Sequence, residues 1–243
     1  MTEATRAAYA VMHEGWGELV LARPERRNAL VGPMVDDMRA ALAELLAGSA
    51  RAILLRGDGG SFCSGLDVDA FGAQPPPAWR DTWAEAYAGL HRELYECPAV
   101  IVGALERFAI NAGASLALAC DLLVAGEGAY LLIGEAAVGM HAPMNIAWLR
   151  LRASEAVAAQ LALAAQRVGG PELRRLGLAY QVVADAEVLD SGRQLAAKLA
   201  GYPGQGLAAV KAGLRRPAPH DSSLFAAAQA GGPRTAGPSR VRG

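Results

Sequence analysis

Cysteine and the aromatic residues are scarce in this chain. Cys63, Cys97 and Cys120 are the only cysteines, and an odd, sparse set of this kind is not a disulfide framework. We therefore expect three buried thiols and a reducing, cytoplasmic location. Aromatic residues make up 6% of the chain, whereas hydrophobic residues make up 53%. The core must therefore consist mainly of Ala, Leu and Val.

A dominant charge and a long apolar segment are also lacking. The formal net charge is -1 and no basic block occurs, so nothing indicates a nucleic-acid partner or an anionic membrane surface. No apolar run reaches the roughly 18 residues of a membrane span, and residues 1–17 hold no apolar core of signal-peptide length. We expect no membrane partner. His and Cys show no metal-ligand spacing and no Gly-rich phosphate loop occurs, so we expect neither a metal nor a nucleotide cofactor.

The order of strand and helix patterns indicates how the 243 residues are organised. Up to about residue 140, short apolar strands such as residues 52–56 and 100–104 alternate with helical patterns. From about residue 145 the pattern is mostly helical. We therefore predict an α/β fold with a core at residues 1–140, a helical C-terminal segment at 141–230 and a flexible tail at 231–243.

Two segments directly after predicted strands suit a backbone that approaches a ligand. Residues 61–69 (SFCSGLDVD) contain a glycine that lets the chain turn sharply. Residues 106–121 (ERFAINAGASLALACD) contain Asn111, a favourable N-cap, before small residues that leave the first N–H groups of a helix open to a ligand oxygen. Each segment alone could equally be an ordinary turn or a tightly packed helix.

A third segment, residues 130–143 (YLLIGEAAVGMHAP), places one carboxylate among apolar residues. Burial should raise the pKa of Glu135, which suits a base that must also return its proton. A lone glutamate more often caps a helix or pairs with an arginine. Glu135 is therefore informative only together with the other two segments.

In this order and spacing, the three segments resemble the crotonase (enoyl-CoA hydratase/isomerase) superfamily over roughly residues 8–215. Residues 22–30 (ARPERRNAL) resemble its first CoA-binding segment, and residues 62–67 (FCSGLD) resemble its first oxyanion-hole segment. The stretch ending at residues 119–121 resembles its second oxyanion-hole segment, and residues 176–183 (LGLAYQVV) its late helix-to-strand passage. The resemblance implies a crotonase-like β-β-α spiral core with an α-helical C-terminal segment. It also implies an acyl-CoA substrate, no further cofactor, and a homotrimer or homohexamer.

The same resemblance assigns the site residues. The backbone N–H groups of Leu66 and Ala112 would form the oxyanion hole, and Glu135 would be the catalytic carboxylate. Backbone groups at five positions would hold the adenine and pantetheine parts of CoA: Arg27, Ala29, Ser64, Asp67 and Val68. Asp67 matches the family's Gly-x-Asp turn, and we expect a structural role for its side chain.

Two departures from the family pattern bear on the reaction. Hydratases of the family use two glutamates, and Ser115 stands at the position of the first one. Asn111-Ala112-Gly113 replaces a Gly-rich run, which Ala112 tolerates if its φ is negative. A 1,3-proton shift needs only one base and an oxyanion hole. The sequence therefore favours a Δ3,Δ2-enoyl-CoA isomerase. Residues 139–149 also resemble this branch of the family, which keeps a single glutamate.

Several alternatives stay open at this point. An enoyl-CoA hydratase would need Ser115 or His141 in place of the missing acid; we instead expect Ser115 to bond back to the carbonyl of Asn111. We also expect a solvated loop position for His141. Decarboxylation or thioester hydrolysis would use the same enolate. A non-catalytic acyl-CoA-binding subunit would bind CoA without turnover.

Overall fold

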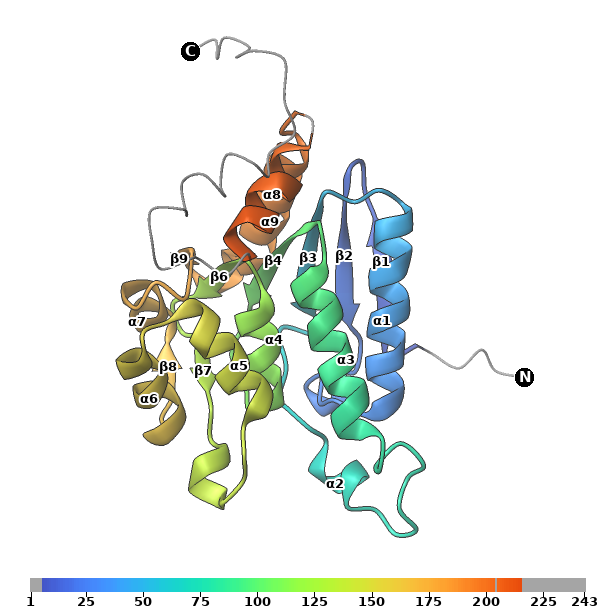
Figure 1. The fold of residues 1–243 in the computed structure, drawn as a ribbon, viewed down its shortest axis with the longest axis vertical. Coiled ribbons are helices and arrows are strands. Elements are labelled where there is room, and N and C mark those ends of the chain that lie inside the picture. The colour runs from blue at the N-terminus through green and yellow to red at the C-terminus, as the bar shows by residue number, and fades with distance from the viewer. Residues whose placement is uncertain (1–5, 204, 216–243) are drawn as a thin grey trace, which may run out of the picture.

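The structure of the protein is a computed structural model that describes residues 6–203 and 205–215 (Figure 1). It is built from two sheets and the helices that cover them, so the predicted α/β class is confirmed. The predicted tail at residues 231–243 lies outside the described residues, and the predicted boundary near residue 140 stays a prediction.

The larger sheet has six strands in the order β1-β2-β3-β4-β6-β9. Its strands are β1 (Ala8–Met12), β2 (Trp16–Leu21), β3 (Ala52–Gly57), β4 (Val100–Leu105), β6 (Leu122–Gly126) and β9 (Gln181–Val183). β1 and β2 form an antiparallel hairpin, and every other neighbouring pair in this sheet is parallel. β3 and β4 are buried along their whole length, as is typical of a parallel sheet covered on both faces.

The smaller sheet has the order β5-β7-β8. Its strands are β5 (Phe108–Ile110), β7 (Tyr130–Leu132) and β8 (Val168–Gly169). β5 and β8 were not predicted, because strands of three and two residues carry too little pattern to be recognised. A parallel bridge between Cys63 and Ala109 holds the first predicted segment against β5.

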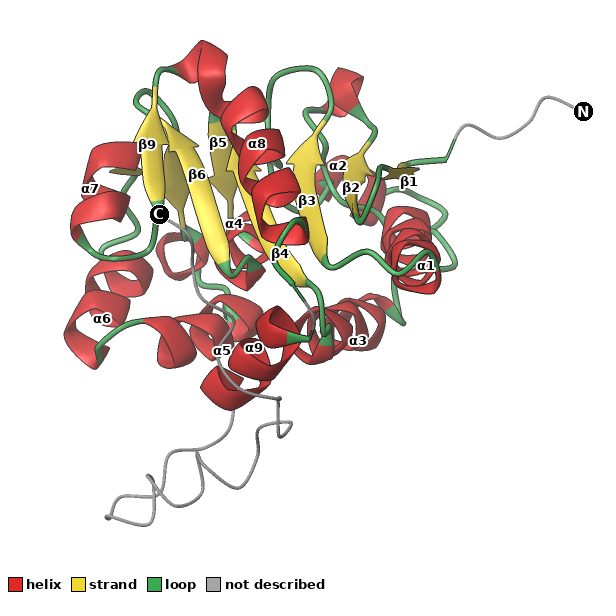
Figure 2. Ribbon diagram, turned by 90° about the horizontal axis from the view of Figure 1, so that it is seen from above, coloured by secondary structure: helices red, strands yellow, loops and turns green. Residues whose placement is uncertain are grey.

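Helices cover both faces of the larger sheet (Figure 2). They are α1 (Gly32–Ala47), α2 (Val68–Phe71), α3 (Trp83–Glu96), α4 (Ala112–Ala119), α5 (Pro143–Arg152), α6 (Glu155–Leu163), α7 (Gly170–Arg175), α8 (Val188–Ala200) and α9 (Gly206–Arg215). Alternate residues of β3 enter different cores: Ala52 and Leu54 pack with residues of α8, whereas Ile53 and Leu55 pack with residues of α1 and α3. This period of two is the one that a pleated strand imposes.

The three cysteines agree with the expectation from the composition. Cys63, Cys97 and Cys120 are free and buried, as predicted. None of the helices in the described part of the chain is long and apolar enough to cross a membrane.

Candidate active site

The first two predicted segments lie side by side because two glycines let their backbones meet. Cys63 N donates to the carbonyl of Phe108 at 3.2 Å, and Ile110 N donates to the carbonyl of Cys63 at 3.1 Å. Gly65 has a φ of +93°, and a Cβ atom there would lie 2.7 Å from the carbonyl oxygen of Ile110. A Cβ atom on Gly113 would lie 2.6 Å from the carbonyl oxygen of Cys63. Only glycine permits either approach.

This packing leaves two backbone amides open. Within residues 6–203 and 205–215, neither the N–H of Leu66 nor that of Ala112 has a hydrogen-bond partner. Ala112 is the first residue of α4, and the first N–H groups of a helix have no acceptor within the helix. Leu66 directly follows the turn at Gly65. Both residues line one cavity of about 540 Å³.

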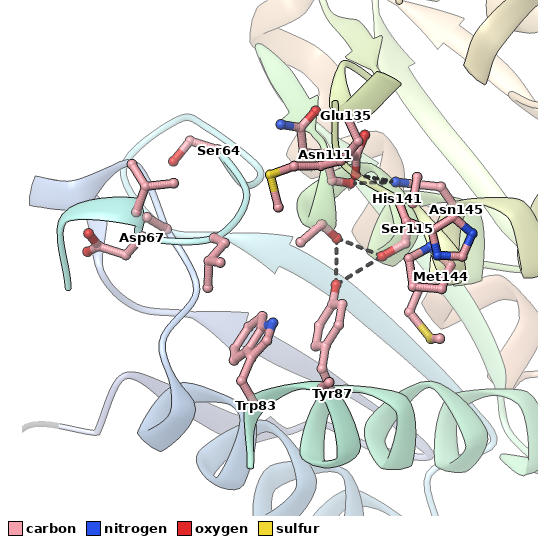
Figure 3. Close-up of a pocket in the computed structure, with 18 of the residues that line it drawn as sticks. Ser64, Asp67, Trp83, Tyr87, Asn111, Ser115, Glu135, His141, Met144 and Asn145 are labelled. Carbon is pink, nitrogen blue, oxygen red and sulfur yellow. Dashed lines mark hydrogen bonds between the residues drawn. The ribbon is translucent and has the colours of Figure 1, made fainter. Parts of the chain in front are cut away.

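All eight residues predicted for the site line this same cavity. They are Arg27, Ala29, Ser64, Leu66, Asp67, Val68, Ala112 and Glu135. Figure 3 shows Ser64 and Asp67 on one side of the cavity and Glu135 on the other. The wall between them carries Trp83 and Tyr87 of α3, whose rings are stacked with centroids 4.9 Å apart. His141 also lines the cavity and is exposed, as predicted.

Asn111 carries the backbone strain of the second segment. Its φ of 51° and ψ of -116° lie in a region that residues other than glycine rarely adopt. Its side chain does not cap α4, so the prediction of a side-chain cap was wrong. Instead, its Oδ1 accepts a hydrogen bond from Gly134 N at 2.8 Å, and its backbone N–H donates to Leu132 O at 2.7 Å. These bonds to the strand β7 and to the residue before Glu135 hold the strained turn in place.

Glu135 begins a short 3₁₀ helix and is only 8% exposed. Asn145 Nδ2 donates to its Oε1 at 3.0 Å. Oε2 is buried and has no hydrogen-bond partner among the residues that the structure describes. Burial therefore raises the pKa of Glu135, while the bond from Asn145 lowers it by a smaller amount. The direction predicted from the apolar neighbours is confirmed.

Asp67 is buried as well, but its carboxylate is fully paired. It accepts from Arg26 Nη2 at 2.9 Å, from Arg23 Nη2 at 3.1 Å and from Ala70 N at 3.1 Å. The hydrogen bond from Arg26 is the largest cause that lowers the pKa of Asp67 to about 2. Asp67 thus caps α2 and ties it to the segment that contains Arg23 and Arg26, which supports the structural role expected for it.

Ser115 lies in a buried network that the sequence did not reveal. Its Oγ donates to Ala112 O at 2.7 Å, so the predicted bond to the carbonyl of Asn111 was wrong. The same Oγ lies 3.0 Å from Tyr87 Oη and 3.1 Å from His91 Nε2. Trp148 Nε1 donates to His91 Nδ1 at 2.8 Å.

The proton positions in this network follow from its partners. Because His91 Nδ1 accepts the Trp148 N–H, the neutral ring carries its own proton on Nε2 and donates it to Ser115. Burial lowers the pKa of His91 to about 3, so the ring stays neutral near pH 7. Burial also raises the pKa of Tyr87 well above its ordinary value. The whole network is therefore uncharged.

Tyr87 and Asn145 line the cavity but were not among the predicted site residues. His91 and Trp148 do not line it and connect to it by hydrogen bonds through Ser115. The helical spacing of Trp83, Tyr87, Leu90 and Leu94 in the sequence is the one found in α3. It also places His91 four residues after Tyr87, on the same face. No comparable signal marks Asn145 and Trp148 in α5. In the described ranges, no group of three His, Cys, Asp or Glu side chains is arranged to hold a metal.

Comparison with known proteins assigns the family. A model of the enoyl-CoA hydratase/isomerase family matches residues 12–230. The chain belongs to this family, within the crotonase superfamily. A probable enoyl-CoA hydratase of Rhodobacter capsulatus is 36% identical to it over 221 residues, which cover 89% of this chain and 85% of the relative. The 1,2-epoxyphenylacetyl-CoA isomerase of Escherichia coli is 32% identical, covering 82% of this chain and 78% of the relative.

Solved structures of crotonase relatives have the same fold. A putative enoyl-CoA hydratase of Thermobifida fusca, solved in complex with CoA, superposes with a TM-score of 0.80 and 27% identity, covering 93% of this chain and 92% of that one. An enoyl-CoA hydratase of Mycobacterium smegmatis superposes with a TM-score of 0.83 and 25% identity, covering 92% and 88%. The crotonase-like fold is confirmed, and the chain is an acyl-CoA enzyme of the hydratase/isomerase type. Because the relatives bear both hydratase and isomerase names, the choice of reaction depends on the site residues.

Proposed function

We propose that this crotonase is a Δ3,Δ2-enoyl-CoA isomerase that uses Glu135 as its single proton shuttle. The observation that carries the proposal is the uncharged network around Ser115, at the position where hydratases of the family place a second glutamate. The Ser115 hydroxyl is committed to Ala112 O, Tyr87 and His91. None of the groups in this network is ionised near pH 7, so none of them can act as the second carboxylate that activates water.

Glu135 differs from the other carboxylates along the cavity. Asp67 and Asp69 are both paired with Arg26, and Glu25 is exposed. Within the described part of the chain, Glu135 has no cationic partner and its pKa is raised. A group that removes a proton and then gives it back works best when its pKa is moved toward the working pH. This environment supports Glu135 as the base.

The proposed mechanism requires only the groups already described. The thioester oxygen of a 3-enoyl-CoA would accept from the N–H groups of Leu66 and Ala112, and the start of α4 favours negative charge there. Glu135 would remove a proton from C2, leaving a dienolate, and would return the proton to C4. Each oxyanion donor is typically worth about 100- to 1,000-fold in rate.

CoA is proposed to lie along the backbone around Arg27, Ala29, Ser64, Asp67 and Val68, which form one side of the cavity. Hydrogen bonds join this backbone into one unit: Ser64 N donates to Arg27 O at 3.1 Å and Leu30 N donates to Gly65 O at 2.7 Å. We propose no cofactor beyond the CoA thioester itself. We also propose that the protein assembles as a homotrimer or homohexamer and is located in the cytoplasm.

An enoyl-CoA hydratase is the second candidate, since the Rhodobacter capsulatus relative bears that name. Its missing acid would have to be His141, which lines the cavity, or Ser115. His141 is exposed to solvent, and the Ser115 hydroxyl is already hydrogen-bonded within the buried network. Each is therefore a poorer candidate for the acid than the glutamate that it would replace.

Parallel assays with 3-enoyl-CoA and 2-enoyl-CoA thioesters test the proposal. We expect conversion of 3-enoyl-CoA to 2-enoyl-CoA and no hydration of 2-enoyl-CoA beyond the uncatalysed rate. Hydration of 2-enoyl-CoA at a rate similar to isomerisation would favour the hydratase. Binding of both thioesters without turnover of either would identify a non-catalytic acyl-CoA binder.

A further inference from the structure

Asn145 contacts both halves of the site through one amide nitrogen. Its Nδ2 lies 3.0 Å from Glu135 Oε1 and 3.0 Å from the carbonyl oxygen of Asn111 (Figure 3). An amide NH₂ group carries two protons, so it can donate to both acceptors at once. The side chain is 2% exposed, so water cannot readily replace it in either bond.

The orientation of this amide is fixed by its partners. The carbonyl of Asn111 can only accept, and an ionised Glu135 can only accept, so Nδ2 must face both of them. Asn145 Oδ1 is consequently buried without a partner among the described residues. An unpaired buried acceptor typically costs about 1–3 kcal/mol. The side chain keeps this orientation because the two bonds from Nδ2 require it.

The bond to Asn111 bears directly on the amide of Ala112. The carbonyl of Asn111 and the N–H of Ala112 belong to one planar peptide group, in which they point in opposite directions. A rotation that relieved the strain at Asn111 would therefore turn the Ala112 N–H as well. Ala114 N and Ser115 N also donate to this carbonyl, at 2.9 and 3.3 Å, but both belong to the segment that begins at the strained turn itself. Asn145 holds it from a different helix, α5.

We propose that Asn145 is a positioning residue that links the proton shuttle to the oxyanion hole: one N–H orients Glu135 and the other holds the peptide of Ala112. The inference rests on the proposed roles of Glu135 and Ala112. It explains why a polar side chain lies at a buried position of α5 with one of its own atoms unpaired. It also means that the geometry of the two groups cannot change independently.

The test replaces Asn145 with leucine, whose side chain has the same number and branching of heavy atoms and no donor. We expect kcat for 3-enoyl-CoA to fall on the order of 100-fold while KM stays within a few-fold, since a misdirected oxyanion donor affects the transition state most. The acid limb of the pH–kcat profile should move to higher pH, because the ionised form of Glu135 loses a donor. Asn145→Asp keeps the shape of the side chain and should move the limb in the same direction.

Trp148→Phe is the matched control, because it lies on the same helix, is 3% exposed and removes one buried hydrogen bond. It should lower the stability of the fold without moving the acid limb. If Asn145→Leu and Asn145→Asp both keep the wild-type limb and kcat, the inference is overturned. If Glu135→Gln keeps its turnover, the proposed function fails instead, so the two failures can be told apart.

Discussion

The cavity has a buried carboxylate on each side, and these two have opposite environments. Asp67 is 3% exposed and Glu135 is 8% exposed. Asp67 accepts hydrogen bonds from two arginines and a backbone amide, and its pKa falls to about 2. Glu135 accepts one from a neutral amide, and burial raises its pKa. The two carboxyl groups therefore shift their pKa values in opposite directions: hydrogen bonds from arginine dominate at Asp67, and desolvation dominates at Glu135.

The difference separates a carboxylate that organises the chain from one that can exchange protons. A carboxylate paired with two guanidinium groups stays ionised at every pH where the protein works, so it cannot serve as a shuttle. A buried carboxylate with an unpaired oxygen can accept a proton at little cost. Substitutions of Glu135, Asp67, Asp69 and Ser115 test these separate roles.

The largest effect is expected for Glu135→Gln. This change keeps the size of the side chain and removes the base, and a sole acid–base group is typically worth up to about 10,000-fold in kcat. KM should change little, because CoA is proposed to be held by backbone groups on the other side of the cavity. Steady-state kinetics with 3-enoyl-CoA measures both quantities. Turnover near the wild-type rate would require a different reaction for this protein.

Asp67→Asn should affect stability more than turnover. Breaking its pairs with Arg23 and Arg26 should lower the free energy of unfolding by about 2 kcal/mol, with kcat within about 10-fold of wild type. Because the pKa of Asp67 is lowered on folding to about 2, its stabilisation is present above the unfolded pKa near 3.9 and is lost as the pH falls toward 2. Urea unfolding at pH 7 and pH 3 should therefore show a smaller difference between mutant and wild type at pH 3.

The exposed neighbour Asp69 provides the control for this measurement. Its side chain is 79% exposed although it pairs with the same Arg26, so Asp69→Asn should change the free energy of unfolding by less than about 1 kcal/mol. Equal losses for Asp67→Asn and Asp69→Asn would contradict the distinction between a buried, fully paired carboxylate and a surface ion pair.

Ser115→Ala should have the smallest effect on the reaction. Turnover should stay within a few-fold of wild type, because the hydroxyl only bridges His91 to the carbonyl of Ala112, to which Tyr87 Oη also donates directly. The loss should appear in the free energy of unfolding, at about 1 kcal/mol, since the buried Nε2–H of His91 loses its acceptor. A fall in kcat of a hundredfold or more would place the hydroxyl in the chemistry and favour the hydratase.

The sequence predicted those parts of the site that are marked by a local pattern of residues. Gly65 and the small residues around Gly113 mark close backbone approaches, and Glu135 stands out as one charge in an apolar stretch. Each of these signals lies within a few residues of the group that it identifies. Local apolar patterns also predicted the strands β3 and β4.

The rest depended on contacts between distant segments. Asn145 reaches back 34 residues to Asn111, and Trp148 reaches back 57 residues to His91. A polar residue in a helix normally faces solvent, so neither pattern nor composition indicated that Asn145 points inward. Nothing in the sequence indicated that Trp148 would donate to His91. The strain at Asn111 was also hidden, because asparagine before a helix normally caps it with its side chain.

The burial of the three cysteines makes each of them a reporter on the motions of the molecule. Cys63 belongs to the first predicted segment and lies against Gly113 of the second. Cys97 follows α3 and Cys120 follows α4. Burial raises the pKa of Cys63 and of Cys120 to about 12, and only the thiolate reacts with alkylating agents. Each thiol can therefore be labelled only while its surroundings are briefly open. The labelling rates of the three positions would record how often the segments that carry Leu66 and Ala112 open compared with the sheet that supports them.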